Sequence, residues 1–106
     1  MKVFIKKAKA NVDAAGEFNP QTGHLTVLEG SRLSERIAFS EKFRGAKTIE
    51  RNREGVVING ILKQNVEFKS ASTAANFVTG SSSNGLITWR TEDGVKLKDI
   101  LSAEKK

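Results

Sequence analysis

The chain has 106 residues, which gives room for one domain with a modest hydrophobic core. It contains no cysteine, which excludes disulfide bonds, thiolate catalysis and cysteine metal sites and is compatible with a reducing compartment. Eighteen Lys and Arg residues against twelve Asp and Glu residues give a formal net charge of +6, and this excess favours a polyanionic partner such as nucleic acid.

Apolar runs are short, and lysines alternate with apolar residues at the N-terminus. This pattern predicts neither a membrane-spanning helix nor the apolar segment of a signal peptide. We therefore expect a cytoplasmic protein that does not associate with a membrane. The sequence leaves the oligomeric state open.

The N-terminal part of the chain predicts antiparallel strands. A first strand covers residues 3–5 or runs on over residues 3–14, because apolar residues alternate with polar ones there. The proline and glycine of residues 19–23 predict a turn, and a return strand follows over residues 25–28. We expect an antiparallel hairpin over residues 3–29, with a third strand as the alternative.

Residues 43–54 predict a helix with one apolar face. On the opposite face, Arg44, Lys47 and Arg51 recur at i, i+3 and i+7 and form a cationic stripe. One interpretation is that the stripe contacts an external anion such as a nucleic-acid phosphate. The other is that it is a solvated helix face whose charge is offset by two nearby glutamates.

The clearest hairpin signal follows this helix. Two short stretches, residues 55–58 and 61–65, are separated by Asn59 and Gly60, and each has apolar residues next to this pair. Both turn residues accept a positive φ, which a type I′ turn requires.

An alanine-rich helix is predicted next. Small and apolar residues recur on one face of it, at Ala71, Ala74, Ala75 and Val78, and Phe77 widens that face. Ser70 or Ser72 is the expected N-cap, and Gly80 suits the position just past the helix. This pattern predicts a core helix.

A polar loop over residues 81–85 leads to Trp89, which we expect to anchor the returning chain. Residues 92–94 predict a tight turn, and residues 96–103 predict a short terminal helix. The predicted fold class is therefore α+β. It is one small domain over residues 1–106, with an N-terminal antiparallel β-hairpin, a helix, an Asn-Gly β-hairpin, an Ala-rich helix, a short strand and a C-terminal helix.

The most specific pattern begins at Ser70 and reads Ser-x-Ser-x-Ala-Ala-x-Phe-Val-x-Gly-x-Ser-x-Asn-Gly, followed by Trp89 and then by Asp-Gly-x-x-Leu. It resembles an uncharacterised bacterial and archaeal family, domain of unknown function 4357, which is found C-terminal to GIY-YIG-type nuclease domains. It is also similar to RAMA domains, which are named for their association with restriction enzymes and adenine methylases. The resemblance covers residues 4–101, and Leu28-Glu-Gly-Ser-Arg and Phe43-Arg-Gly fall where such domains carry comparable motifs.

The resemblance implies an accessory nucleic-acid-recognition module in restriction, repair or mobile-element systems. DNA is the expected nucleic acid in preference to RNA, modified bases are a proposed target for the RAMA-like relatives, and a nuclease or methyltransferase polypeptide is an expected partner. Two positions depart from the family pattern. Ala71 stands where proline is usual, a mild change at a first helical position, and Leu86 stands where an aromatic residue is common, which weakens the case for base stacking there.

The sequence predicts no enzyme. GIY-YIG cleavage needs its tyrosines, and the chain has none. The single histidine, His24, lies in a predicted hairpin, and no Gly-x-Ser-x-Gly elbow accompanies it. No histidine or cysteine stands at metal-ligand spacing. We therefore expect no catalytic residue, no metal and no cofactor.

The expected nucleic-acid site combines three groups of residues. Cations for phosphate contacts are Arg44, Lys47, Arg51, Lys69 and Arg90. Ser70 and Ser72, at a helix N-terminus, add anion-binding donors. The groups that approach bases are Ser81, Ser82, Ser83 and Asn84, with or without Trp89.

A purely structural role also stays open for these residues, because the loop over residues 81–85 can shape a turn and Trp89 can be a core residue. The alternative function is a protein-interaction module that tethers a nuclease or methyltransferase without contacting nucleic acid. Salt dependence separates the two functions, because phosphate contacts weaken with added salt whereas a protein interface centres on apolar anchors.

Overall fold

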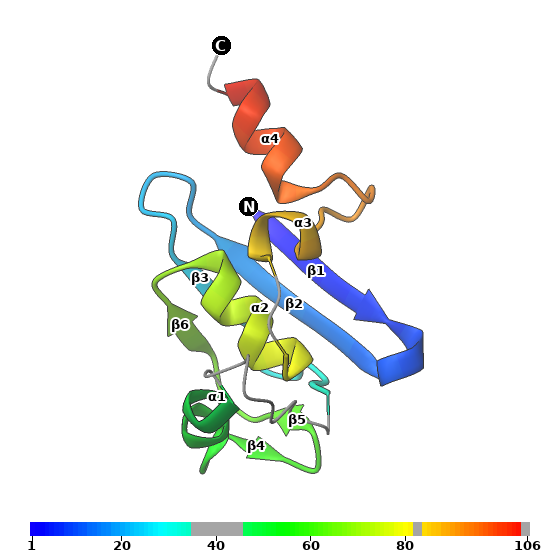
Figure 1. The fold of residues 1–106 in the computed structure, drawn as a ribbon, viewed down its shortest axis with the longest axis vertical. Helices are drawn as coiled ribbons and strands as arrows, with labels where there is room; N and C mark the ends of the chain where they lie inside the picture. The colour runs from blue at the N-terminus through cyan, green and yellow to red at the C-terminus, as the bar shows by residue number, and fades with distance from the viewer. Residues whose placement is uncertain (35–45, 82–83, 105–106) are drawn as a thin grey trace.

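The computed structural model describes residues 1–34, 46–81 and 84–104. Four antiparallel strands form the main sheet in the order β1-β2-β3-β6, and a separate two-stranded hairpin consists of β4 and β5 (Figure 1). The strands are β1 (Lys2–Lys7), β2 (Val12–Phe18), β3 (Leu25–Val27), β4 (Val57–Ile58), β5 (Ile61–Leu62) and β6 (Val66–Phe68). The helices are η1 (Ala8–Ala10, a 3-10 turn), α1 (Ala46–Arg53), α2 (Ala71–Thr79), α3 (Gly85–Thr88) and α4 (Leu97–Glu104).

The predicted α+β class is confirmed, as are several local predictions. Ser70 caps α2, and Gly80 ends it with φ 74°. Asn59 and Gly60 join β4 to β5 with φ of 53° and 79°, as a type I′ turn requires. The predicted turn over residues 92–94 is present, with Gly94 at φ 84°.

Two predictions about strands are corrected. A continuous strand over residues 3–14 is wrong, because the chain reverses at η1, where Asn11 adopts φ 55° and donates its N–H to the carbonyl of Ala8 at 3.1 Å. The alternative of a third strand is right, because β3 pairs with β2. The short strand expected before the C-terminal helix is also wrong, since the four-residue helix α3 stands there and the chain after it forms isolated bridges, from Arg90 to Phe4 and to Lys96.

The described part of the predicted helix over residues 43–54 is α1, and its apolar Ile49 is buried. Phe43 and Arg44, which belong to that prediction, lie outside the described residues.

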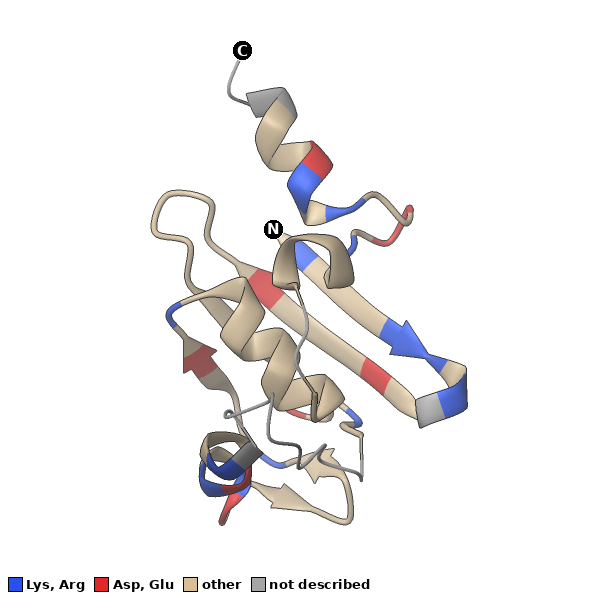
Figure 2. Ribbon diagram, viewed as in Figure 1, with Lys and Arg blue, Asp and Glu red and all other residues tan. Residues whose placement is uncertain are grey.

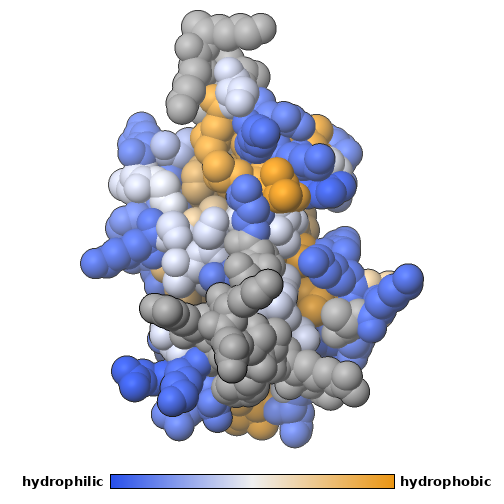
Figure 3. Space-filling model, viewed as in Figure 1, coloured by the Kyte–Doolittle hydropathy of each residue, from blue (hydrophilic) through white to orange (hydrophobic). Residues whose placement is uncertain are grey.

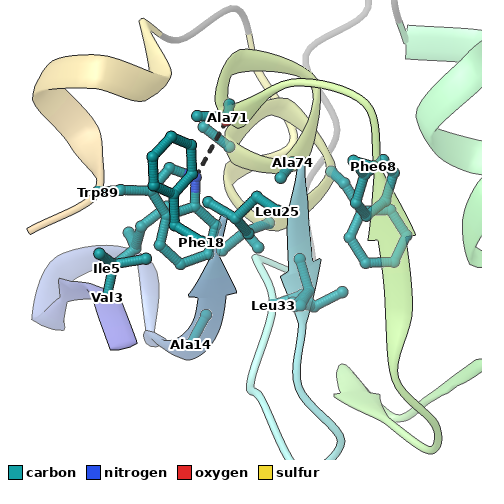
Figure 4. Close-up of a cluster of buried hydrophobic side chains, with 14 of the residues drawn as sticks. Val3, Ile5, Ala14, Phe18, Leu25, Leu33, Phe68, Ala71, Ala74 and Trp89 are labelled. Carbon is teal, nitrogen blue, oxygen red and sulfur yellow. Dashed lines mark hydrogen bonds between the residues drawn. The ribbon is translucent and has the colours of Figure 1, made fainter. Parts of the chain in front are cut away.

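The hydrophobic core lies between one face of the sheet and α2 (Figures 1 and 4). The alternate residues Val3 and Ile5 of β1 point into it, together with Phe18 of β2 and Leu25 of β3. The alanines of α2 let its backbone approach the sheet closely, and its large side chain Phe77 packs with a ring-centroid distance of 4.9 Å to Phe68. Fully burying one such aromatic ring stabilises the fold by about 2 to 3 kcal/mol.

Arg53 fixes the C-terminal end of α2. Its guanidinium donates hydrogen bonds to the carbonyls of Phe77 at 2.6 Å, Val78 at 3.3 Å and Ser34 at 2.6 Å. The last carbonyls of a helix have no partner inside the helix, and this end of the helix dipole favours a cation. Burial lowers the pKa of Arg53 to about 10, so the guanidinium stays charged at neutral pH.

Replacing Arg53 by methionine removes the guanidinium donor from the carbonyls of Phe77 and Ser34, whereas the carbonyl of Val78 still accepts from the N–H of Ser34 at 2.9 Å. We expect Arg53→Met to lower the free energy of unfolding by about 2 to 4 kcal/mol. Arg51→Met, on the exposed face of the same helix, is the matched control and should change it by less than about 0.5 kcal/mol. Urea unfolding followed by the fluorescence of Trp89 measures both, and equal effects of the two variants would contradict the bridging role.

Candidate nucleic-acid interface

The pattern that begins at Ser70 and ends at Gly85, called here the serine- and glycine-rich motif, connects the start of α2 to α3. Ser70 Oγ accepts a hydrogen bond from a backbone N–H in the first turn of α2 at 3.2 Å. Ser72 Oγ accepts from the N–H of Gly85 at 3.0 Å, and Asn84 Oδ1 accepts from a backbone N–H of α3 at 3.0 Å. Three polar side chains of the motif therefore satisfy backbone donors at helix starts.

Trp89 is part of the core. Its side chain is 0% exposed, and Nε1 donates to the carbonyl of Ala71 at 3.0 Å (Figure 4). Gly16 of β2 makes room for the ring, because a Cβ there would lie 3.2 Å from Trp89 Cζ3. Of the two interpretations of Trp89, the core residue is therefore confirmed, and the indole has no exposed face on which a base could stack in this structure.

Gly85 has no room for a side chain. A Cβ at this position would overlap the backbone of Ala71 and Ser72, because the start of α3 packs directly against the start of α2. The N-terminus of α2, expected to receive an anion, is therefore contacted by α3. Ser70 and Ser72 have structural partners here, and their contact with nucleic acid stays a prediction.

The remaining predicted residues do not form one site. Lys47 and Arg51 are exposed on α1, which lies at the opposite end of the molecule from α4 (Figure 1). Lys69 is exposed between β6 and α2, and Arg90 is exposed directly after α3. Ser81 is half-buried and Asn84 is exposed, while Arg44, Ser82 and Ser83 lie outside the described residues.

A different cluster gathers on the outer face of β1. Lys2, Phe4 and Lys6 point away from the core, because Val3 and Ile5 between them point into it. The ammonium groups of Lys2 and Lys6 lie 5.9 Å and 5.5 Å from the centroid of the half-buried Phe4 ring. One aromatic ring thus stands between two cations on this face.

Two further cations continue the cluster beyond the edge of β1. Phe4 and Arg90 exchange both backbone hydrogen bonds, at 2.6 Å and 3.0 Å, and Lys96 is in turn paired with Arg90. Directly opposed residues of antiparallel segments carry their side chains on the same face. We call Lys2, Phe4, Lys6, Arg90 and Lys96 the Phe4 face.

A groove of about 530 Å³ opens beside this face. Its lining residues come from β1 (Phe4, Ile5, Lys6 and Lys7), from the end of α3 (Ile87 and Thr88) and from the segment that follows α3 (Arg90, Thr91, Glu92 and Gly94). Its volume lies in the range of small-molecule sites. Three of these residues are cations and one is a carboxylate, so the groove suits a ligand with both an anionic and an apolar part.

Within residues 1–34, 46–81 and 84–104, none of the four cations of the Phe4 face has a carboxylate within 4.0 Å. Glu17 lies opposite Lys2 in the sheet, but it binds the N-terminal ammonium of Met1 at 2.7 Å. Asp13 lies opposite Lys6 without an ion pair to it. Blue segments along β1 and at the start of α4 mark this basic side of the molecule (Figure 2).

Of the Phe4 face, the sequence analysis predicted Arg90 as a site residue and missed Lys2, Phe4, Lys6 and Lys96. The alternation Lys-Val-Phe-Ile-Lys over residues 2–6 does contain a signal, because it puts a ring and two cations on one face of a strand. The pairing of Phe4 with Arg90 depends on α3, which the sequence does not predict.

A model of the family described as Domain of unknown function (DUF4357) matches residues 3–101. The chain belongs to this family. The membership expected from the serine- and glycine-rich motif is therefore confirmed, whereas association with nucleases or RAMA domains stays a prediction. No curated protein and no solved structure matches the chain significantly. No helix in the described part is long and apolar enough to cross a lipid bilayer.

The family motif leads to a stability prediction at Gly85. A Cβ there collides with backbone atoms, which cannot rotate away, so Gly85→Ala should lower the free energy of unfolding by about 2 to 3 kcal/mol. Gly23→Asn is the control, because Gly23 has positive φ with open space around it and asparagine tolerates that conformation. Thermal unfolding measures both variants, and a stable Gly85→Ala protein would show that α3 can move off α2.

Proposed function

We propose that the domain is a non-catalytic nucleic-acid-recognition module that binds through the Phe4 face. The observation that carries the proposal is the placement of Phe4 between Lys2 and Lys6, in one row with Arg90 and Lys96. Unpaired cations contact phosphates, and a surface aromatic ring contacts bases. This combination also agrees with the net charge of +6.

An alternative explanation covers only part of the cluster. Edge strands often carry lysines that prevent pairing with another chain, and β1 is an edge strand. This accounts for Lys2 and Lys6. It does not account for Arg90 and Lys96 in the same row, or for a half-buried phenylalanine at the mouth of a groove. Those three features favour a ligand.

DNA is the nucleic acid that we propose first. The resemblance to domains beside GIY-YIG-type nucleases and restriction-modification components supports DNA, and it makes a nuclease or methyltransferase polypeptide the proposed partner. In that arrangement the other polypeptide supplies catalysis and this domain supplies affinity for the target. Four phosphate contacts would give a log-log slope of affinity against salt of about −3.6 on duplex DNA and about −2.8 on a single strand.

The test compares two double variants, each of which removes two positive charges without introducing negative ones. Lys6→Ala/Arg90→Ala removes cations of the Phe4 face, whereas Lys47→Ala/Arg51→Ala removes the exposed cations of α1. We expect the first to weaken DNA binding about tenfold at low salt, roughly 1.4 kcal/mol, and to reduce the salt slope by about 1.5. The second should bind like the wild type.

Fluorescence anisotropy with labelled DNA, titrated at several salt concentrations, gives both quantities. Loss of binding in the α1 variant alone would move the interface to the stripe predicted from the sequence. An absence of DNA and RNA binding by the wild type at low salt would overturn the proposed function.

A second candidate function is protein tethering, and an exposed apolar patch favours it. Leu86 on α3 and Val95 before α4 are 37% and 42% exposed, and apolar surface is visible over α3 and α4 (Figure 3). If this patch anchors a nuclease or methyltransferase, Leu86→Ser/Val95→Ser should weaken that complex at least tenfold with little salt dependence. Calorimetric titration with the partner polypeptide measures it, and an unchanged affinity would exclude this patch as the anchor.

A further inference from the structure

The groove beside Phe4 exposes backbone hydrogen-bonding groups as well as side chains. The register with β2 turns the N–H and C=O of every second residue of β1 toward the free edge. The N–H and C=O of Phe4 form hydrogen bonds with the backbone of Arg90, and this backbone pairing does not extend to Lys6. The N–H and C=O of Lys6 point to the same edge, and the described residues give them no backbone partner. A donor and an acceptor therefore line the groove side by side.

We infer that this groove takes one unpaired nucleotide of a single-stranded nucleic acid. Its base contacts the apolar lining residues Phe4 and Ile87, its Watson–Crick edge faces the backbone of Lys6 and the carboxylate of Glu92, and its phosphate lies on Arg90. The inference rests on the proposed function and adds the form of the nucleic acid to it.

The lysines over Phe4 do not prevent base stacking. A cation–π contact at an exposed site is weak. A base stacked on an aromatic side chain contributes about two to three times as much free energy to binding. Lys2 and Lys6 have long flexible stems and exposed ends, so a base can replace their contact with the ring while the ammonium groups turn to phosphates.

Only an unpaired base can use this site. In a duplex both faces of each base are stacked and its Watson–Crick edge is paired, so neither the ring of Phe4 nor the edge of β1 can reach them. A phosphate-only interface would need neither the ring nor the groove. The ring and the free strand edge together therefore favour single strands over duplexes.

Glu92 adds a preference among bases. A carboxylate accepts hydrogen bonds and cannot donate them, so it suits the exocyclic amino group of cytosine and not the carbonyl of thymine. Glu92 is exposed and lines the groove together with three cations. We therefore expect oligo-dC to bind about threefold or more tightly than oligo-dT of the same length.

The test uses the whole chain and fluorescein-labelled oligonucleotides of about 12 nucleotides, a length that spans one binding site. A mixed-sequence single strand, its duplex, oligo-dC and oligo-dT are titrated at low salt by anisotropy. The inference predicts that the single strand binds at least about fivefold more tightly than its duplex.

Three variants locate the nucleotide. Phe4→Leu keeps an apolar residue on β1 but removes the stacking surface, and it should weaken single-strand binding about tenfold while changing duplex binding less than twofold. Ile87→Ser removes the other exposed apolar side chain of the groove lining, and Ile58→Ser on β4 is its matched control, because the two side chains are 41% and 55% exposed. Glu92→Gln should abolish the preference for oligo-dC, because its amide both donates and accepts.

The outcomes distinguish a failure of the single-nucleotide site from a failure of the proposed nucleic-acid function. Binding of single strand and duplex with equal affinity, unchanged by Phe4→Leu and by Ile87→Ser, would overturn the single-nucleotide site and leave the nucleic-acid function standing. An absence of binding to all oligonucleotides by the wild type would overturn both. Single-strand preference lost in Phe4→Leu and Ile87→Ser, but kept in Ile58→Ser, would establish the site. Emission of the buried Trp89 checks that each variant is folded.

Discussion

The contact between the starts of α2 and α3 is the constraint on which the rest of the structure depends. Gly85 lets the two backbones touch, the hydroxyl of Ser72 accepts its N–H, and the indole of Trp89 reaches the carbonyl of Ala71. These contacts fix the direction in which the chain leaves α3. Arg90 then meets the free edge of β1, so a contact inside the core places a cation on the surface.

The short helix α2 is held at both ends. With nine residues it is too short to be stable alone in water. Ser70 and α3 fix its beginning, while Gly80 and the guanidinium of Arg53 satisfy its last carbonyls. Arg53 comes from α1, so the same bridge attaches α1, and the cations it carries, to the core. The small alanines of α2 bring it close to the sheet, and the polar contacts at its two ends fix its position along the sheet.

Local signals in the sequence predicted the parts of the fold that depend on local physics. The cap at Ser70 and the positive φ of Gly80 and Gly60 follow from what these residue types favour. The reversal near Asn11 was missed because apolar alternation continues across the turn. Helix α3 was expected as a strand because its two apolar residues fit either structure, and its capping by Asn84 decides between them only with its hydrogen bond in view.

The candidate site was harder to predict because it joins distant parts of the chain. Phe4 stands in the first strand and Arg90 follows α3, and only the packing of α3 on α2 puts them opposite each other. The motif that identifies the family consists largely of residues that make this packing. Similarity between two sequences in this motif therefore indicates a shared fold. The ligand proposed here depends on the Phe4 face and on Glu92, which lie outside that packing, so the motif by itself does not indicate a function.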